Sequence, residues 1–164
     1  MIDSNTFLSG IVFDGMERLL LRTLIHSDHV LLLAKFSVSE VERVLRRKFP
    51  SMIQDYENVL QSLDAEILPF PDKSEVERCI EIIRDDHDAP ILASTIKARP
   101  DVFVTGDKDF FEERVRVLIR VATTRETLEL ILNFDSKKSE NSQARGKMKR
   151  KTDVPPQWSI MQSL

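Results

Sequence analysis

The sequence has very little cysteine, since Cys79 is the single one among 164 residues. It cannot form a disulfide within the chain, and no Cys/His ligand spacing is present, which argues against structural zinc and fits a reducing compartment. No apolar stretch approaches the roughly 20 residues of a membrane-spanning helix. The first residues also lack the charged and apolar regions of a secretory signal. The sequence therefore predicts a cytoplasmic location.

The net charge of -3 hides two parts of opposite sign. From Asp135 onward, seven Lys or Arg residues accompany three Asp or Glu residues, so this part carries +4 and residues 1–134 carry -7. We predict an acidic folded domain over residues 1–134 and a basic, disordered tail over residues 135–164, which has almost no aliphatic side chains before an apolar segment at 154–161. The tail is either a phosphate-attracting segment or a solvated terminus.

Short apolar runs alternate with stretches of helical periodicity along the predicted domain. Strand-like runs cover residues 30–34, 102–105 and 115–121, Ile2 indicates a short first strand, and residues 65–68 form a strand or an extended connection. Helical spacing covers residues 16–24, 38–45, 52–63, 76–83, 91–96 and 123–132. Strands separated by helices predict an α/β fold, here a three-layer α/β/α sandwich with a mainly parallel central sheet.

Four carboxylates stand where strands end or helices begin. Asp3 follows Ile2, Asp107 follows the strand-like run at 102–105, and Asp88 directly precedes a helix with proline in its first turn. Glu40 is expected in the first turn of the helix after the run at 30–34. Sites in open parallel sheets lie beyond the carboxyl ends of the strands. We therefore expect the four side chains to meet at one edge of the sheet.

Each carboxylate also has a purely structural explanation. Asp3 and Asp88 suit helix N-caps, Asp107 suits a turn after glycine, and Glu40 would complete a capping box with Ser37. Four such caps at one edge are a less economical account than one shared site. Clustered carboxylates repel each other and favour a bound cation. Oxygen ligands without His or Cys indicate Mg²⁺ or Mn²⁺, ions that suit phosphodiester cleavage.

Four motifs in order resemble those of the PIN-domain family. Residues 3–10 (DSNTFLSG) resemble its opening Asp-Thr-Asn motif, and residues 37–45 (SVSEVERVL) resemble the helix that bears its second acidic residue. Residues 88–93 (DAPILA) and 104–110 (VTGDKDF) resemble the third and fourth motifs. The resemblance covers residues 1 to about 134 and implies the PIN fold.

The resemblance implies a catalytic set of four acidic residues: Asp3, Glu40, Asp88 and Asp107. The metal ligands among them would be Asp3, Asp88 and Asp107, with Asp109 as a further carboxylate. Asn5 and Thr6 would orient Asp3, and Thr105 would support Asp107, by hydrogen bonds. Glu42 is the rival of Glu40 for the second acidic position, and the spacing to Val44-Leu45 favours Glu40.

The implied activity is endonucleolytic hydrolysis of single-stranded RNA by metal-activated water, with Glu40 positioning or deprotonating the water. The resemblance further implies a toxin of a toxin–antitoxin pair, an antitoxin that covers the site, and a homodimer. Candidate cations that guide the RNA backbone are Arg84, Lys97, Arg99, Lys108 and the tail. His87, beside Asp88, is a ligand, a base or incidental.

Three other classes stay open on the sequence alone. A haloacid dehalogenase-type phosphatase requires a second Asp two residues after the first, where Asn5 stands. A receiver-like phosphorylation domain requires a phospho-acceptor Asp and a late Lys, and no convincing pair is visible. The third class is a non-catalytic RNA- or protein-binding module with the same fold, which has no reason to retain mutually repelling charges.

Overall fold

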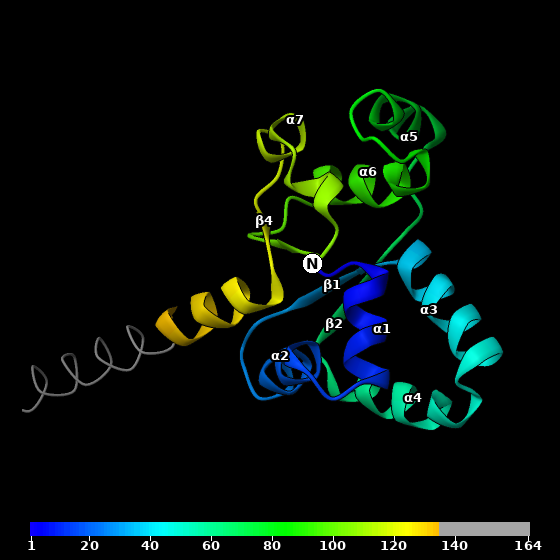
Figure 1. Ribbon diagram of the computed structural model, residues 1–164, viewed down its shortest axis with the longest axis vertical. Helices are drawn as coiled ribbons and strands as arrows, with labels where there is room; N and C mark the ends of the chain where they lie inside the picture. The colour runs from blue at the N-terminus through cyan, green and yellow to red at the C-terminus, as the bar shows by residue number, and fades with distance from the viewer. Residues whose placement is uncertain (135–164) are drawn as a thin grey trace, which may run out of the picture. The chain divides into compact units, whose positions relative to one another are not determined.

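The computed structural model describes residues 1–134 (Figure 1). Contacts divide the chain into two units, Met1–Leu128 and Glu129–Leu164. The first unit is described below, and the described part of the second, residues 129–134, is helical. The predicted tail at 135–164, with its apolar segment at 154–161, lies outside the described residues and stays a prediction.

The structure contains two pairs of parallel strands. In the first pair, β1 (Leu31–Ala34) runs beside β2 (Ala65–Leu68) with Leu31 opposite Ala65. In the second pair, β3 (Phe103–Val104) runs beside β4 (Val121–Ala122). The extended segment predicted at 65–68 is therefore a strand.

The first residues of the chain join the two pairs. Ile2 forms a parallel bridge with Val104, and the Asp3 amide donates to the Val104 carbonyl at 3.1 Å. On the other side, the Ile2 amide donates to the Leu32 carbonyl at 3.3 Å. The order across the sheet is thus β2, β1, residues 1–3, β3, β4. Asp3 leaves this sheet next to the strand that leads to Asp107.

Helices surround the strands: α1 (Ser4–Val12), α2 (Met16–Ile25), α3 (Lys35–Lys48), α4 (Ile53–Ser62), α5 (Lys73–Ile80), α6 (Ala89–Ala98) and α7 (Glu113–Arg116). Short 3-10 turns cover Pro50–Met52, Asp86–Asp88 and Lys108–Phe111. In Figure 1, α5 and α6 lie on one side of β1, while α1, α2 and α4 lie on the other.

Both faces of the sheet are buried, as the continuous apolar runs predicted. Ala34 belongs to a core cluster with residues of α5 and α6, and Leu32 packs against the same cluster. Leu31 and Leu33, which point to the opposite face, are 3% and 0% exposed. Helices on both sides of a parallel sheet agree with the predicted α/β sandwich.

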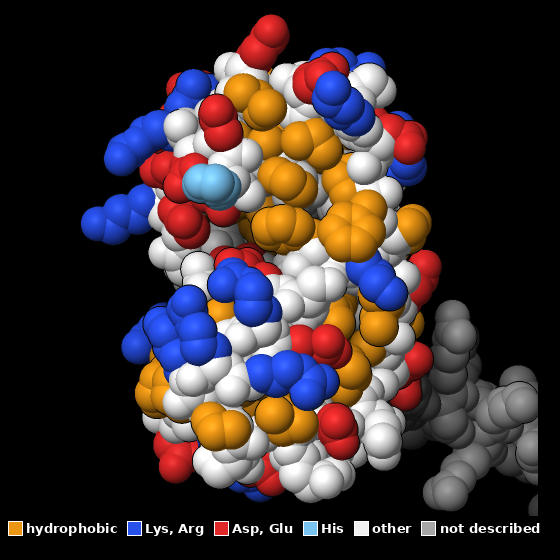
Figure 2. Space-filling model, turned by 90° about the vertical axis from the view of Figure 1, so that its right-hand side faces the viewer, with side chains coloured by type: hydrophobic (Ala, Val, Ile, Leu, Met, Phe, Trp, Pro, Cys, Tyr) orange, Lys and Arg blue, Asp and Glu red, His pale blue; other side chains and the backbone are white. Residues whose placement is uncertain are grey.

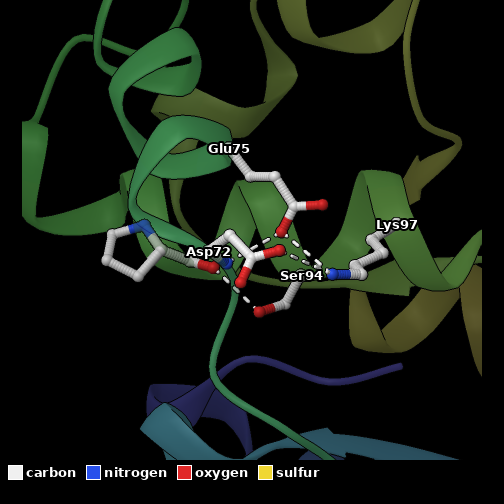
Figure 3. Close-up of polar contacts among 5 residues, drawn as sticks. Asp72, Glu75, Ser94 and Lys97 are labelled. Atoms are coloured by element: carbon white, nitrogen blue, oxygen red, sulfur yellow. Dashed lines mark hydrogen bonds and ion pairs between the residues drawn. The ribbon is translucent and has the colours of Figure 1, made fainter.

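A capping box and a lysine fix α5 against α6 (Figure 3). Asp72 caps α5, and its amide donates to the Glu75 carboxylate at 2.8 Å. The Lys97 ammonium on α6 lies 3.1 Å from Glu75 and 3.5 Å from Asp72. On α6 itself, Ser94 donates to the Pro90 carbonyl at 2.9 Å. Lys97 therefore forms ion pairs that connect α6 to the start of α5. These ion pairs explain its position without the role in guiding RNA that the sequence suggested.

The strand predicted over residues 115–121 is wrong for most of its length. Val115 lies in α7, and only Val121 belongs to a strand, β4. Val115 and Ile119 are 0% and 8% exposed, whereas Val117 and Leu118 between them are 72% and 47% exposed. This burial follows a helical spacing of four residues, which a continuous apolar run does not reveal.

The last predicted helix begins as expected. Residues from 124 onward are helical, and the Thr123 amide donates to the Glu126 carboxylate at 2.8 Å while the Glu126 amide donates to the Thr123 hydroxyl at 3.3 Å. This reciprocal arrangement is a capping box. No helix within residues 1–134 is long and apolar enough to cross a membrane.

Candidate nuclease site

Four separate segments of the chain line one cavity of about 240 Å³. Its acidic lining residues are Asp3, Glu40, Asp88 and Asp107. The other lining residues are Ser4, Asn5, Phe36, Arg43, His87, Ile91 and Phe110. The structure therefore brings together the four carboxylates that the sequence placed at one edge of the sheet.

Asp3 is both an N-cap and a wall of the cavity. Its Oδ1 accepts a 2.7 Å hydrogen bond from the Thr6 amide, which caps α1, and its Oδ2 accepts a 2.5 Å hydrogen bond from the Thr105 hydroxyl. The residue is 6% exposed. Burial raises the pKa of Asp3, the hydrogen bonds from Thr105 and Thr6 oppose this shift, and nearby Asp107 adds to it.

The Thr105 hydroxyl connects two of the carboxylate segments. While it donates to Asp3, it accepts a 3.0 Å hydrogen bond from the Asp107 amide. Asp107 in turn accepts a 2.9 Å hydrogen bond from the Asp109 amide, so the chain turns tightly after β3. Thr105 is fully buried and fixes the distance between the first and fourth acidic segments.

Glu40 reaches the cavity from the second turn of α3, one turn later than expected. The helix begins at Lys35 after β1, so the predicted capping box with Ser37 is wrong. Ser37 is buried inside the helix, and among the described residues its hydroxyl has no hydrogen-bond partner. Glu40 accepts a 2.6 Å hydrogen bond from Ser4 and lies 3.6 Å from the Arg43 guanidinium.

The rival glutamate lies on a different face of α3. Glu42 accepts a 3.2 Å hydrogen bond from the hydroxyl of Tyr56 on α4 and is absent from the cavity lining. The placement of Glu40 and Glu42 thus favours Glu40 as the second acidic residue.

Asp88 occupies the N-cap position of α6, but within the described residues its side chain makes no capping hydrogen bond. The carboxylate is therefore available to the cavity. Burial raises the pKa of Asp88 to about 6, and the negative charges of Asp107, Asp85, Asp109 and Asp3 add to the shift. A cation bound beside Asp88 would compensate the surrounding negative charge and favour the ionised carboxylate.

Three further residues were singled out near the site from the sequence: Asp109, Asn5 and His87. Asp109 is not a lining residue, and its carboxylate lies 3.7 Å from the Arg84 guanidinium. Asn5 is exposed and lines the cavity, as does His87. The roles predicted for Asp109 in metal binding and for Asn5 in orienting Asp3 stay predictions.

The donor set fits Mg²⁺ or Mn²⁺ in chemistry. The four acidic side chains supply only oxygen ligands, and a divalent cation would offset the burial and the neighbouring negative charges that raise the pKa of Asp88. Within residues 1–134, no three acidic, His or Cys groups already stand in a metal-ligand arrangement.

Sequence reasoning missed five lining residues: Ser4, Phe36, Arg43, Ile91 and Phe110. The signal for two of them was available, because Phe36 and Arg43 lie four residues before and three residues after Glu40. Residues at these spacings share one face of a helix. Ser4 has no such signal, since its bond to Glu40 joins segments 36 residues apart.

Similarity to known proteins agrees with this architecture. A family model described as a PIN domain matches residues 1–109, which is well over half of the chain. The chain therefore belongs to the PIN-domain family. No curated protein matches the chain. PIN domains are generally nucleases that use divalent metals, so the fold and the family define a nuclease-type domain. The matched residues contain all four acidic residues of the cavity.

Proposed function

We propose that this protein is a Mg²⁺- or Mn²⁺-dependent endoribonuclease that cuts single-stranded RNA. One observation carries the proposal: Asp3, Glu40, Asp88 and Asp107, from four separate segments, line a single cavity. Carboxylates that serve only as helix caps have no need of a common cavity. A metal-dependent phosphodiester-cleaving site uses such a carboxylate cluster to hold its divalent cation.

The residues divide the work by position. Asp3, Asp88 and Asp107 would hold the ion, which when bound supplies positive charge for the phosphate and lowers the pKa of water. Thr105 keeps Asp3 and Asp107 in fixed relation through its two hydrogen bonds. Glu40, held by Ser4, would position the attacking water and accept its proton.

A toxin role, with an antitoxin that covers the cavity and a homodimeric assembly, is the finer part of the proposal. It is supported by the family resemblance alone. Co-expression with the product of the neighbouring gene tests it: a stable complex that suppresses RNA cleavage is expected, and the absence of both binding and inhibition would end this part of the proposal.

The nuclease proposal is tested by incubating purified protein with labelled single-stranded RNA and Mg²⁺ or Mn²⁺. We expect internal cuts that EDTA stops and that Asp107→Asn abolishes. Glu42→Gln is the matched control, because Glu42 is acidic but contacts Tyr56 outside the cavity. Cleavage that survives both EDTA and Asp107→Asn would come from a contaminating nuclease. RNA binding without cleavage under either ion would instead favour the non-catalytic binding module.

A further inference from the structure

One face of α3 leads from the cavity to the protein surface. Phe36, Glu40 and Arg43 line the cavity and follow a spacing of four and three residues. The next residue on this face is Arg47, four residues after Arg43. At about 100° per residue, these four positions fall within roughly 60° of the helix circumference. We call these four residues the α3 stripe.

The outer half of the α3 stripe is cationic and open to solvent. The Arg43 side chain is 62% exposed and lies 3.6 Å from Glu40, and Arg47 is exposed. A cation in the last turn of a helix is commonly explained by the helix dipole, and Arg47 fits that explanation. Arg43 precedes the last turn, so the dipole does not account for its position at the cavity.

The negative charge of the cavity would repel RNA, and the two arginines of the α3 stripe can offset that repulsion. A polyanionic strand that approaches four carboxylates is repelled unless cations hold its backbone nearby. Figure 2 shows Lys and Arg side chains gathered on one side of a hollow and Asp and Glu side chains on the other. Guanidinium groups suit phosphate because their paired N–H donors match its oxygens.

We propose that single-stranded RNA runs out of the cavity along the α3 stripe, with successive phosphates on Arg43 and Arg47 and a base against the ring of Phe36. Arg43 and Arg47 are separated by roughly 6 Å along the helix axis, comparable with one nucleotide step of an extended strand. Phe36 is half-buried in the cavity wall, and an aromatic ring stacks on any base. This inference rests on the proposed function, because it names how that same site takes its substrate.

The test compares two double variants on the same helix. Arg43→Gln/Arg47→Gln removes the two cations of the α3 stripe. Arg46→Gln/Lys48→Gln removes two exposed cations from the last turns of α3, away from the stripe. Arg46 faces α4 instead, where its charge acts on the Tyr56 hydroxyl. The two variants therefore match in charge and helix position and differ in the face that they alter.

Binding of a fluorescent single-stranded oligoribonucleotide is measured by anisotropy in EDTA over a series of salt concentrations. Arg43→Gln/Arg47→Gln should raise Kd about tenfold and reduce the slope of log K against log salt by about 1.4, the contribution of two single-strand phosphates. Arg46→Gln/Lys48→Gln should keep Kd within about twofold of the wild type. Phe36→Leu should weaken binding and leave the salt slope unchanged, because stacking releases no counterion.

Two results would overturn the inference. Equal weakening by both double variants would mean that only the net charge of α3 matters. Unchanged binding by Arg43→Gln/Arg47→Gln, in a protein that still cleaves RNA, would remove the α3 stripe and leave the proposed function intact. A wild-type protein that neither binds nor cleaves RNA would end both proposals together.

Discussion

At the scale of single residues, the Thr105 hydroxyl links two of the acidic segments that line the cavity. It donates to Asp3 and accepts from the Asp107 amide, and the side chain is fully buried. Thr105→Val keeps the shape and removes both bonds. We expect RNA cleavage to fall about 10- to 100-fold, the usual effect of losing a partner that orients a metal ligand. Initial rates at saturating Mn²⁺ measure this.

Thr95→Val is the control for Thr105→Val. Thr95 is equally buried, but its hydroxyl is hydrogen-bonded to the Ile91 carbonyl within α6 and to the Met1 sulfur instead of to a carboxylate. Thr95→Val should lower the free energy of unfolding by about 1 kcal/mol, and Thr105→Val by about 2 kcal/mol or more, because Thr105 makes two hydrogen bonds and one of them is to a carboxylate. Equal activities of the two variants would show that Thr105 serves only the fold.

The two glutamates of α3 give a second residue-scale prediction. Glu40→Gln should reduce cleavage severely, because a neutral amide cannot accept a proton from water. Glu42→Gln should leave kcat unchanged, since Glu42 contacts Tyr56 outside the cavity. Single-turnover rates with the same RNA compare the two. The opposite ranking would move the second acidic position to Glu42.

Asp88 makes a prediction about pH. Because its pKa is raised to about 6 in the folded protein from 3.8, the folded state binds the proton more tightly than the unfolded state. In the ion-free protein, the contribution of Asp88 to stability therefore falls as pH rises from about 4 to 6 and stays low above this range. Asp88→Asn removes this loss and retains a good N-cap residue.

We expect Asp88→Asn to raise the free energy of unfolding at pH 7 in EDTA by about 1 kcal/mol, a value reduced for the partial solvent exposure of the group. Near pH 4 the variant and the wild type should be equally stable. Chemical denaturation at the two pH values makes the comparison. A variant that is less stable than the wild type at pH 7 would show that Asp88 stabilises the fold instead of straining it.

At the scale of elements, α1 and α2 pack closely against each other at Gly10. A Cβ atom there would lie 2.6 Å from Leu21 Cδ1 and 3.0 Å from the Glu17 carbonyl oxygen. Gly10→Ala should lower the free energy of unfolding by about 1 kcal/mol net, because overpacking outweighs the better helix propensity of alanine. Gly106→Ala is the control, since a Cβ atom at Gly106 meets nothing within 4 Å. Thermal unfolding compares them, and equal Tm values would contradict the close approach.

The sequence predicted elements best where burial and periodicity agree. The strand over 30–34 and the helix over 38–45 were visible because an apolar run and an amphipathic spacing each match a single kind of element. The strand prediction for residues 115–121 was wrong because α7 has only one turn, which is too short to show a helical period in the sequence. The capping box predicted at Ser37 was wrong because the chain passes from β1 directly into α3 without a side chain that caps the helix.

At the scale of the whole molecule, the candidate site could be predicted because sheet topology brings strand ends together. Asp3 and Asp107 follow neighbouring parallel segments, so their proximity is a consequence of the fold. The contacts of Ser4 with Glu40 and of Thr105 with Asp3 could not be predicted, since they join residues 36 and 102 positions apart. Such pairs depend on side-chain geometry that no local pattern encodes.

The most direct test of the account is a calorimetric titration of Mn²⁺ into the metal-free protein, repeated with Asp107→Asn and Glu42→Gln. The account predicts that the wild type and Glu42→Gln bind the ion alike and that Asp107→Asn loses at least most of this affinity. Binding of Mn²⁺ by Asp107→Asn with wild-type affinity, or the absence of binding by the wild type, would contradict the claim that these carboxylates form one metal site.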